Sequence, residues 1–573
     1  MIGFRSISRI LFLLVAAAFL AVACVQEGEP TGEEDASSEE SSMMEDTTAE
    51  ETTSSMDAAA GSGETVDVQI LGFNDLEGNL EPYENDDGEE IGGVAYMDAY
   101  MDEMEAGNPE GTLRVHAGDL VGASPLISAY YHDEPTIEAS NLMELDIGTL
   151  GNHEFDEGGE EMLRLIEGGQ REDGMEEKDG ENTSAPEFEG ADYPYVSANV
   201  VDAETGEPII EPYEVIEVNG VEIGFIGVVT TETPSKVVPD AVEPYEFRDL
   251  SDSINPYAEE LREDGVEAIV VLAHSGNQNE DVEPPEGEIV DEAPQMSDAV
   301  DVVIAGDTPF PLDYDEDGTT VVQGTGTGAD FMAVEMSVDT ESGDVVESSG
   351  EVVEVITADV EPSEDIAAFV EERQEIVAEV SGRTVGEVAE AISTEQNDAG
   401  ESPLGNLIAD AQREYAEADI AFMNPGGIRA DVPEGEITFE DLFTVQPFDN
   451  GLVRVEMTGE EVEGVLEQQF ETPEATILQI SGLEYTYDEE APEGERITEI
   501  ILEDGSEIDP EATYTAAINS FLSTGGDGFT DFTEIGESSE TVGGDLEAFV
   551  GYVEGLEQPF SAPEDDGRIT AAE

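Results

Sequence analysis

The sequence predicts an α/β protein with two folded domains, and three features lead to that prediction. Between Val66 and Asp307, short apolar runs rich in β-branched residues recur, and segments with helical spacing of apolar residues separate several of them. Runs that are apolar almost without interruption are typical of strands covered on both faces. At 573 residues the chain is long enough for two or three domains, and its 39% of hydrophobic residues suffices for ordinary cores.

The expected elements follow one another in a regular order. Seven runs are predicted strands of a first domain at 66–355: VDVQILGF (66–73), TLRVHAGD (112–119), LDIGTLGNHE (145–154), YVSANV (195–200), VEIGFIGVVT (221–230), VEAIVVLAHSG (266–276) and AVDVVIAGD (299–307). Val94, Met97 and Met101 have helical spacing, as do apolar positions at 136–143. Residues 361–380 begin with Pro, Ser and acid and predict a connecting helix. A second mixed α/β domain is expected at 381–560.

Acidic residues dominate the charge of the chain. It contains 143 Asp and Glu against 16 Lys and Arg, which gives a formal net charge of −127. Such a charge strains a compact state by self-repulsion in dilute buffer, whereas molar salt shortens the Debye length to about 3 Å. Because the acid is spread along the whole chain rather than confined to a tail, we interpret it as an adaptation to high salt. Nucleic acid and anionic membranes are poor partners for such a surface.

The N-terminal segment has the pattern of an export signal. Arg5 and Arg9 precede an apolar run at 10–23, which is shorter than the ~20 residues of a membrane span. The run ends in LAVAC, which resembles the lipobox of bacterial lipoproteins, although a lone buried thiol is the other interpretation of Cys24. We expect a signal peptide at 1–23, lipidation of Cys24, and an acidic tether at 24–65 that is too poor in apolar residues to fold. The protein would then be anchored at the outer face of the cell membrane, at the cell surface or in the periplasm.

Polar residues that can bind metal follow five of the predicted strands. In chain order these residues are Asp75 and Glu77, Asp119, Asn152 with His153 and Glu154, His274, and Asp307. One such strand end is weak evidence, but polar groups delivered repeatedly to one edge of a sheet are the usual way in which an α/β domain builds a site. The sequence therefore predicts a functional site at this edge.

Several motifs around these residues resemble one known family. NDLEGNLEP (74–82), AGDLVGASPLISAYYHDEPTIEA (117–139), GNHEFDEG (151–158), LAHSG (272–276) and AGDTP (305–309) look like the calcineurin-like metallophosphoesterase domain of the 5′-nucleotidase / UDP-sugar hydrolase family. ESPLGNLIADA (401–411), NPGGIRADV (424–432), VQPFDN (445–450) and FLSTGGDGF (521–529) resemble its C-terminal substrate-binding domain. The likeness covers 66–560 in the expected order. It implies a four-layer αββα sandwich for the first domain and a phosphoester hydrolase activity.

The resemblance also implies a centre of two divalent ions, which can clamp a phosphate and activate a water molecule. It assigns Asp119 to both ions, Asp75 and Glu77 to the first, and Asn152, His274 and Asp307 to the second. His153 corresponds to the catalytic histidine of the family. Asp156 would orient that histidine and hold its charge.

Three positions depart from the family pattern. The family has Asp-x-His after the first strand, where this chain has Glu77, and Gly-His-x-His at the last motif, where it has Asp307 and Pro309. In one interpretation the centre survives with harder oxygen ligands that favour Mn²⁺ or Mg²⁺ over Zn²⁺. In the other, the first ion is held weakly or not at all, so the protein is a one-metal enzyme or a lapsed one. We favour activity because His153, Asp156, Asn152 and His274 are retained.

The second domain carries the residues expected to bind a nucleotide. By resemblance, Phe448 and Phe521 stack on the base, Asn424 and Arg429 hold the polar end of the nucleotide, and Asp527 binds the ribose hydroxyls. The family often has a basic residue shortly before the Glu of ESPLGN, and TEQNDAGESP (394–403) has none. Phosphate capture is therefore expected to depend on Arg429 and metal.

These features predict hydrolysis of nucleoside 5′-monophosphates, with UDP-sugars and 2′,3′-cyclic nucleotides as further candidate substrates. A non-catalytic surface lipoprotein that binds nucleosides, its metal centre decayed, is the rival from another class. An esterase of another phosphorylated metabolite is a third. No obligate protein partner is expected, and the membrane is contacted only through the lipid on Cys24.

Overall fold

The computed structural model describes residues 64–85, 88–170, 188–278, 285–316, 318–448, 450–470, 475–489, 491–492, 494–535, 539–563 and 567–572. Residues 61–573 form one compact unit. The expected signal peptide, Cys24 and all but the end of the expected tether lie outside the described residues. Among the residues that are described, no helix combines the length and the apolar character that a membrane crossing requires.

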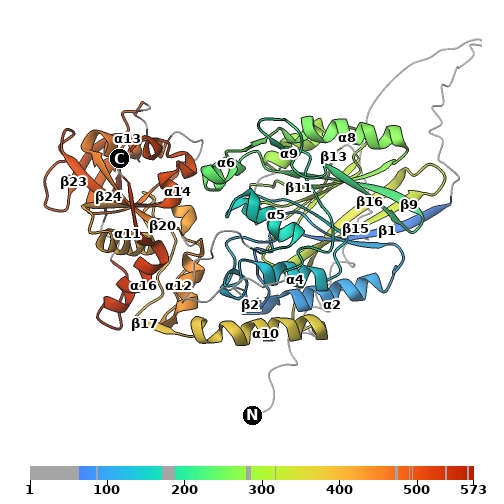
Figure 1. Ribbon diagram of the computed structural model, residues 1–573, viewed down its shortest axis with the longest axis horizontal. Helices are drawn as coiled ribbons and strands as arrows, with labels where there is room; N and C mark the ends of the chain where they lie inside the picture. The colour runs from blue at the N-terminus through green and yellow to red at the C-terminus, as the bar shows by residue number, and fades with distance from the viewer. Residues whose placement is uncertain are drawn as a thin grey trace, which may run out of the picture. The chain divides into compact units, whose positions relative to one another are not determined.

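Two six-stranded sheets form the first domain (Figure 1). The first sheet has the order β16 (Val345–Glu354), β15 (Asp330–Asp339), β1 (Thr65–Phe73), β4 (Thr112–His116), β5 (Ile147–Thr149) and β6 (Tyr195–Val196). The second sheet has the order β13 (Leu312–Glu316), β14 (Thr319–Gln323), β12 (Val302–Ala305), β11 (Ala268–His274), β9 (Val221–Val229) and β8 (Tyr213–Val218). Short pairs, β2 (Pro82–Glu84) with β3 (Glu90–Gly92) and β7 (Val200–Asp202) with β10 (Tyr245–Phe247), lie outside these sheets.

The central strands of both sheets are parallel. β1 pairs with β4 and β4 with β5 in the first sheet, and β11 pairs with β9 and β12 in the second. Parallel strands bring their carboxyl ends to the same edge, so the loops after β1, β4, β5, β11 and β12 can meet. Antiparallel strands flank this arrangement, with β15 and β16 on the first sheet and β8 and β13 at the edges of the second.

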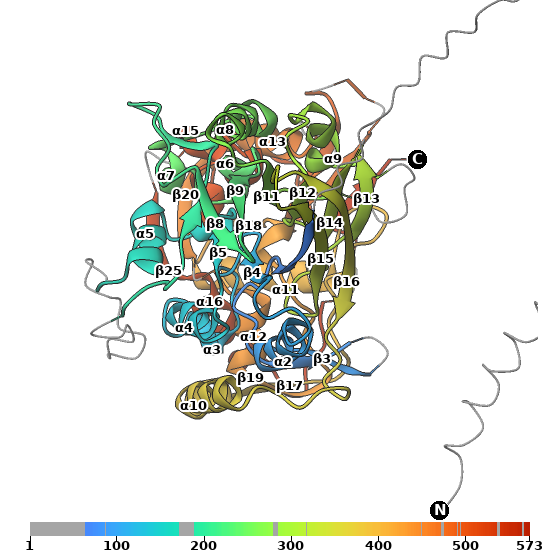
Figure 2. The ribbon, with the colours of Figure 1, turned by 90° about the vertical axis from the view of Figure 1, so that its right-hand side faces the viewer.

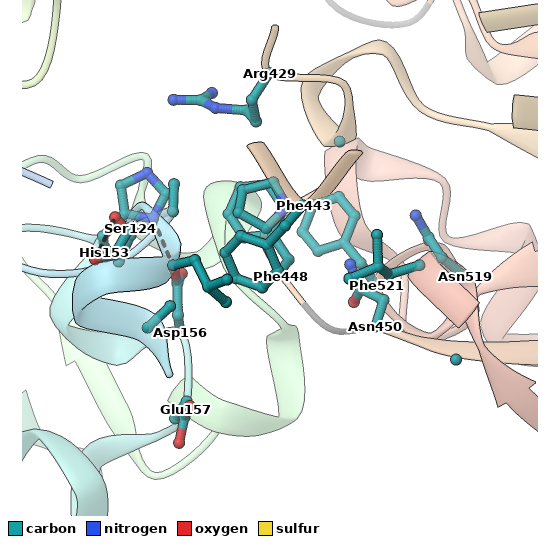
Figure 3. Close-up of a pocket in the computed structure, with 18 of the residues that line it drawn as sticks. Ser124, His153, Asp156, Glu157, Arg429, Phe443, Phe448, Asn450, Asn519 and Phe521 are labelled. Carbon is teal, nitrogen blue, oxygen red and sulfur yellow. Dashed lines mark hydrogen bonds and ion pairs between the residues drawn. The ribbon is translucent and has the colours of Figure 1, made fainter. Parts of the chain in front are cut away.

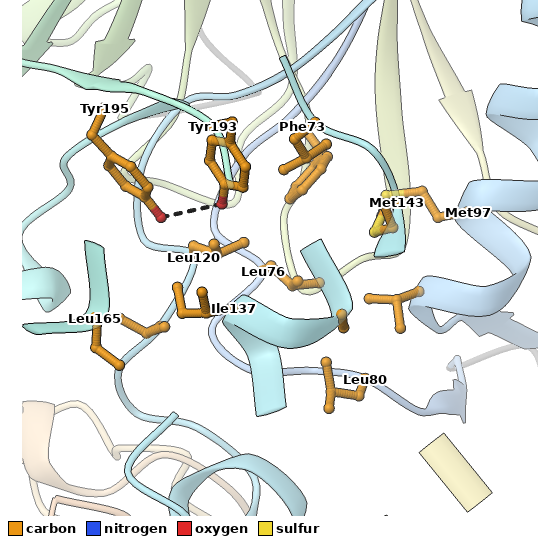
Figure 4. Close-up of a cluster of buried hydrophobic side chains, with 14 of the residues drawn as sticks. Phe73, Leu76, Leu80, Met97, Leu120, Ile137, Met143, Leu165, Tyr193 and Tyr195 are labelled. Atoms are coloured by element: carbon orange, nitrogen blue, oxygen red, sulfur yellow. Dashed lines mark hydrogen bonds between the residues drawn. The ribbon is translucent and has the colours of Figure 1, made fainter. Parts of the chain in front are cut away.

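Three apolar clusters hold together the four layers of the first domain, which are two sheets with helices on each outer face. The first cluster lies between the first sheet and the helices α2 (Val94–Glu105), α4 (Glu134–Leu142), α5 (Gly159–Glu167) and α10 (Glu364–Ser381), and it contains Phe73, Leu76 and Met97 (Figure 4). A second cluster, with Ile70 and Ile304, joins the two sheets. A third packs the second sheet on α8 (Leu250–Asp264) and α9 (Glu288–Glu292). Figure 2 shows α2, α4 and α10 on one side of the sheets and α8 on the other. The predicted αββα arrangement is confirmed.

The helix α10 leads from the first domain into the second. It begins two residues after Pro362, within the segment expected to connect the domains, and contacts α2, α3 (Leu126–Ala129), α4 and α12 (Phe439–Val445). The second domain holds a five-stranded sheet of order β21 (Gln479–Ser481), β18 (Ile420–Met423), β24 (Thr513–Asn519), β20 (Gly451–Thr458) and β25 (Glu540–Gly544). A three-stranded sheet of β23 (Ile497–Leu502), β22 (Leu483–Tyr487) and β26 (Ile569–Ala571), and the pair β17 (Thr384–Val388) with β19 (Gly435–Thr438), complete its strands.

Helices cover both sides of this five-stranded sheet. One cluster joins it to α11 (Pro403–Tyr415), α12 and α16 (Asp545–Gly555), and another to α13 (Gly459–Gln468), α14 (Ser520–Ser523) and α15 (Asp531–Ile535). Capping boxes begin α12 at Thr438 and α13 at Thr458, where each Thr hydroxyl accepts a hydrogen bond from the third helical N–H. The predicted mixed α/β character of this domain is confirmed.

The exposed acidic residues lead to a prediction about how thermal stability depends on salt concentration. On α8, Asp252, Glu259, Glu260, Glu263 and Asp264 are exposed, and Arg262 is the basic residue among them. Lowering the salt concentration from 1 M to 0.1 M lengthens the Debye length from about 3 Å to about 10 Å, so repulsion between such groups grows. We expect the melting temperature, followed by circular dichroism, to fall markedly on this change. At pH 4, where carboxylates are partly protonated, the fall should be smaller; a melting temperature independent of salt at neutral pH would contradict salt adaptation.

Candidate active site

Backbone hydrogen bonds hold together the loops after β1 and β4. Asp75 N donates to Gly118 O at 3.1 Å, Glu77 N donates to Asp119 O at 2.9 Å, and Ala117 N donates to Phe73 O at 2.8 Å. These bonds continue the parallel pairing of β1 and β4 beyond the strand ends. The carboxylates predicted for the first ion therefore project from one joined pair of loops.

Four of the predicted acidic ligands adopt the left-handed backbone conformation. The φ angles are 49° at Asp75, 46° at Glu77, 46° at Asp119 and 78° at Asp307. This conformation costs about 1–2 kcal/mol for a residue with a β-carbon. Backbone strain of this kind clusters at functional sites, where surrounding structure holds it in place. Here the loop hydrogen bonds do so, and the turns that result bring the carboxylates together.

Asp119 lies at the centre of the site. Its Oδ1 accepts a hydrogen bond from His153 N at 2.8 Å, and its Oδ2 lies 3.1 Å from His274 Nε2 and 4.0 Å from His153 Nε2. This carboxylate belongs to two groups of potential ligand atoms. Within each group, all of the ligand atoms lie within 4.8 Å of one another. One group is Asp75, Asp119 and His274, and the other is Glu77, Asp119 and His153. Asp119 belongs to both groups, as a bridging ligand would, but the groups place Asp75 with His274 and Glu77 with His153 rather than Asp75 with Glu77, so the assigned ligand sets stay a prediction.

His274 is oriented as a metal-binding histidine would be. Its Nδ1 donates to the carbonyl of Ala117 at 2.9 Å, which leaves Nε2 facing Asp119 and, at 3.3 Å, the side-chain amide of Asn152. Burial lowers the pKa of His274, but Asp119 and Asp75 outweigh that effect and raise it to about 10. Nε2 thus faces a cluster of negative charge that a proton or a metal ion can satisfy.

The predicted catalytic pair is formed. His153 Nδ1 donates to Asp156 Oδ2 at 2.7 Å (Figure 3), and both residues lie in or next to the 3-10 helix η2 (His153–Phe155). Burial lowers the pKa of His153, but Asp156, Asp119 and Glu77 raise it well above its ordinary value. Because Asp156 occupies Nδ1, it is Nε2 that remains available to a substrate. The ring also stacks on Phe448 of the second domain, with centroids 6.1 Å apart and planes 15° apart.

Asp307 has a different partner from the one expected. Its Oδ1 and Oδ2 lie 2.5 and 2.7 Å from Lys236 Nζ, at the end of α6 (Thr233–Lys236), and it belongs to neither group of ligand atoms. Its role as a metal ligand stays a prediction. We did not single out Lys236 from the sequence, although the chain contains only two lysines, Lys178 and Lys236, and this rarity is a signal.

Glu154 is a second residue whose role the motifs did not reveal. Its buried carboxylate accepts hydrogen bonds from the backbone N–H groups of Gly151, Asp119 and Leu120, at 2.5, 3.1 and 2.9 Å. It therefore ties the loop after β5 to the loop after β4. Burial, together with the charge of Asp119, raises the pKa of Glu154 to about 7. Its place inside GNHE is the sequence feature that could have indicated this role.

A cleft of about 1490 Å³ connects the centre with the predicted substrate residues. Its lining includes His153, Asp119 and Lys236 of the first domain and Asn424, Arg429, Phe448, Phe521 and Asp527 of the second. Figure 3 shows Phe443, Phe448 and Phe521 close together, and the ring of Phe448 stacks on that of His153. The five substrate residues predicted from the sequence are thus brought together, although their roles stay predictions.

Polar contacts hold two sets of the second-domain side chains that line the cleft. Asn424 Nδ2 donates to Asp527 Oδ2 at 3.0 Å, and Asn519 Nδ2 donates to Asn424 Oδ1 at 2.9 Å. The guanidinium of Arg429 lies 5.9 Å from the centroid of Phe448 and 3.5 Å from Glu77 Oε1. Arg429 is therefore close enough to the acidic centre to meet a phosphate bound there.

The residues of the centre fit divalent cations. Burial, with the neighbouring Asp119, raises the pKa of Asp75 to about 7, and burial raises that of Glu77, whereas His274 and His153 overcome burial to lower that of Asp119 to about 2. Several carboxylates thus share a buried space with too little positive charge to keep all of them ionised. Carboxylate and amide oxygens with one or two imidazoles are ligand atoms that divalent metal ions accept.

Comparisons with known proteins place this geometry in context. The model of the 5′-nucleotidase C-terminal domain matches residues 380–534. Endonuclease YhcR of Bacillus subtilis is 36% identical over 519 residues, which covers 89% of this chain and 41% of that protein. Cell wall protein Lmo0130 of Listeria monocytogenes is 36% identical over 538 residues, which covers 86% of this chain and 68% of that protein. The chain thus spans less than half of the first relative and about two thirds of the second.

A solved structure covers both domains. The 5′-nucleotidase precursor of Thermus thermophilus is 27% identical, with a TM-score of 0.72, and the match covers 88% of this chain and 99% of that one. The arrangement of a metallophosphoesterase-like domain followed by a C-terminal domain is therefore shared with a protein described as a nucleotidase.

The His153–Asp156 contact leads to a prediction about protonation. In the metal-free protein, Asp156→Asn removes a negative charge 2.7 Å from Nδ1, so the pKa of His153 should fall. As the pH is raised, His153 of the variant then loses its proton at a lower pH than His153 of the wild type. NMR titration of the imidazole signals can measure this, because the chain has only four histidines. His153→Gln assigns the signal, and an unchanged pKa would contradict the pairing.

Proposed function

The chain belongs to the 5′-nucleotidase family, and from that membership we propose that it is a metal-dependent hydrolase of nucleoside 5′-monophosphates. The observation that carries this proposal is the cleft in which a bridging carboxylate and a paired histidine face a cluster of aromatic side chains. Asp119 joins two groups of ligand atoms, His153 is held by Asp156, and Phe448 stacks beside that histidine.

The chain's own residues would position the phosphate and the leaving group. Asp75, Glu77, Asp119, Asn152 and His274 are the residues that would hold metal. Divalent ions bound there supply Lewis acidity toward the phosphoryl group and make a water molecule more acidic. His153, whose Nδ1 is held by Asp156, would donate a hydrogen bond from Nε2 to the phosphoryl or leaving oxygen. Asp156 keeps the Nδ1 proton in place, so Nε2 is the atom that gives up its proton.

The second domain would supply the nucleoside subsite. Phe448 and Phe521 present aromatic faces for a base, and stacking contributes about 1–3 kcal/mol per base with little preference among bases. The buried pair of Asn424 and Asp527 offers hydrogen-bonding groups for ribose hydroxyls. UDP-sugars and 2′,3′-cyclic nucleotides would present the same base and ribose and are included in the proposal as further substrates.

A relative described as an endonuclease raises the question of polynucleotide substrates. Polynucleotides carry one negative charge per phosphate, and their proteins bind them mainly through basic surfaces. This chain carries a formal charge of −127, so long-range repulsion opposes such a substrate. We therefore propose mononucleotides, and an oligonucleotide belongs in the substrate screen as the competing case.

We propose two divalent ions, Mn²⁺ or Mg²⁺ rather than Zn²⁺, because the centre offers more oxygen ligands than imidazoles. We also propose an extracytoplasmic location, which the relative described as a cell wall protein supports, with a lipid anchor on Cys24. No protein partner is part of the proposal. Activity is expected at molar salt, where the acidic surface is screened.

Replacement of the catalytic histidine tests the mechanism. His153→Ala should lower phosphate release from AMP and UMP in molar salt by about 10²–10⁴-fold or more, because general acid catalysis is lost. His132→Asn is a matched control: His132 lies on the same cleft but in neither group of ligand atoms, and asparagine tolerates its φ of 53°. Unchanged turnover in His153→Ala would refute the assigned role.

Metal dependence provides a separate prediction. Chelation and dialysis should abolish phosphate release, and Mn²⁺ or Mg²⁺ should restore it better than Zn²⁺. Mass-spectrometric metal analysis of the reloaded protein should then approach two ions per chain. A protein that retains no metal yet binds nucleosides would instead be the non-catalytic binder, and a rate maximum with Zn²⁺ would reject the oxygen-rich centre.

A further inference from the structure

A lysine lies at the edge of the acidic centre in a chain that has almost no lysine. Lys236 is one of two lysines among 573 residues, and its Nζ contacts both carboxylate oxygens of Asp307, at 2.5 and 2.7 Å. Glu232 is a more distant acidic neighbour, at 3.8 Å. The ammonium group is thus held by one carboxylate from a position on α6, outside the motifs that supply the metal ligands.

This ammonium group lies between the buried centre and the open cleft. The Asp307 side chain is 8% exposed, whereas that of Lys236 is 29% exposed and lines the cleft with His153 and Asp119. Asp307 Oδ1 lies 3.6 Å from His274 Nε2, which in turn lies 3.1 Å from Asp119 Oδ2. A group bound beside Asp119 would therefore have the lysine within its reach.

The backbone and the side chain of Asp307 have separate partners, and the side chain binds Lys236. Its backbone N donates to Asp75 Oδ2 at 2.9 Å, which fixes the turn, while its side chain points to Lys236. An ammonium carries three donors, and a carboxylate whose two oxygens both contact it leaves N–H capacity toward the cleft. Pro309, two residues later, has no side-chain ligand atom, so the turn after β12 contributes only this one carboxylate to the site.

The cleft needs such a cation because a phosphate monoester brings negative charge into acidic surroundings. The basic side chains among the described residues of its lining are His132, His153, Lys236, Arg383 and Arg429. Arg383 contacts Glu554 at 2.6 Å, and His132 lies 3.8 Å from Glu157. Besides His153, the cations next to the acidic centre are Arg429, beside Glu77, and Lys236, beside Asp307.

We propose that Lys236 binds the phosphate group of the substrate and that Asp307 positions this lysine instead of ligating a metal ion. The proposal rests on the proposed function and names a further residue of the same site. Lys236 would provide a charge-assisted hydrogen bond from the first domain, opposite Arg429 of the second. Phosphate would then be held from both walls of the cleft.

Binding of inorganic phosphate to the Mn²⁺-loaded protein, measured by isothermal titration calorimetry in molar salt, tests this directly. Lys236→Met keeps the length of the side chain and removes its charge, so the dissociation constant should rise about tenfold or more. Metal content, measured by mass spectrometry, should stay as in the wild type for both Lys236→Met and Asp307→Asn. Loss of a metal ion from Asp307→Asn would overturn the positioning role and restore Asp307 as a ligand.

A double variant separates phosphate binding from simple charge neutralisation. Lys236→Met leaves Asp307 unpaired and can disturb the fold, whereas Lys236→Met with Asp307→Asn removes both charges together. The double variant should still bind phosphate about tenfold more weakly than the wild type. Wild-type affinity in the double variant would mean that the pair is only structural, and the proposal would fail. A wild type that binds phosphate but hydrolyses no nucleotide would instead reject the proposed function alone.

Discussion

The carboxylate of Asp119 is the contact on which the rest of the site depends. It is almost fully buried, yet it stays ionised because His274 and His153 lie against it. Its backbone is held as firmly as its side chain, since Glu154 accepts from its N–H and Glu77 donates to its carbonyl. In both groups of ligand atoms, the other members lie within 4.8 Å of an oxygen of Asp119. Moving Asp119 would therefore disturb both groups of ligand atoms at once.

Positive charge is scarce in this protein, which has 16 Lys and Arg against 143 Asp and Glu. Ten of the lysines and arginines among the described residues take part in ion pairs. They include Arg114, which joins Asp98, Asp102 and Glu105 on α2, and Arg164, which joins Glu134 and Glu161. Lys236 and Arg429 differ from Arg114 and Arg164 because they line the cleft next to the acidic centre, beside Asp307 and Glu77. Under the proposed function, a phosphate in this cleft would therefore meet only a few cationic side chains.

The parts of the fold that were predictable are those with a simple local pattern. The seven apolar runs correspond to β1, β4, β5, β6 with β7, β9, β11 and β12, because buried parallel strands are continuously apolar. We did not predict β15 and β16, the antiparallel strands at the end of the first sheet. β16 (Val345–Glu354) is largely exposed, and its sequence VVESSGEVVE mixes acid, serine and valine as a surface segment does. Its place depends on pairing with β15, which is a long-range interaction.

The site was predictable to the extent that its residues lie in motifs at strand ends. His153, Asp156 and the ligand candidates after β1, β4, β5 and β11 converge as expected. The contact of Arg429 with Glu77 was not predictable, because it joins residues 352 positions apart and neither motif specifies the other. The pairing of Lys236 with Asp307 was hidden for the same reason. Side-chain partners across separate loops follow from the packing of sheets and domains and not from local spacing.

The backbone bonds between the loops after β1 and β4 have a consequence for how such a centre can change over time. Because Asp75, Glu77 and Ala117 are tied through main-chain atoms, the hydrogen bonds that join these loops do not require particular side chains. The position of Glu77, where the family has histidine, can then hold a glutamate while these bonds are kept. The ligand set of such a centre can therefore change while the backbone that presents it stays in place.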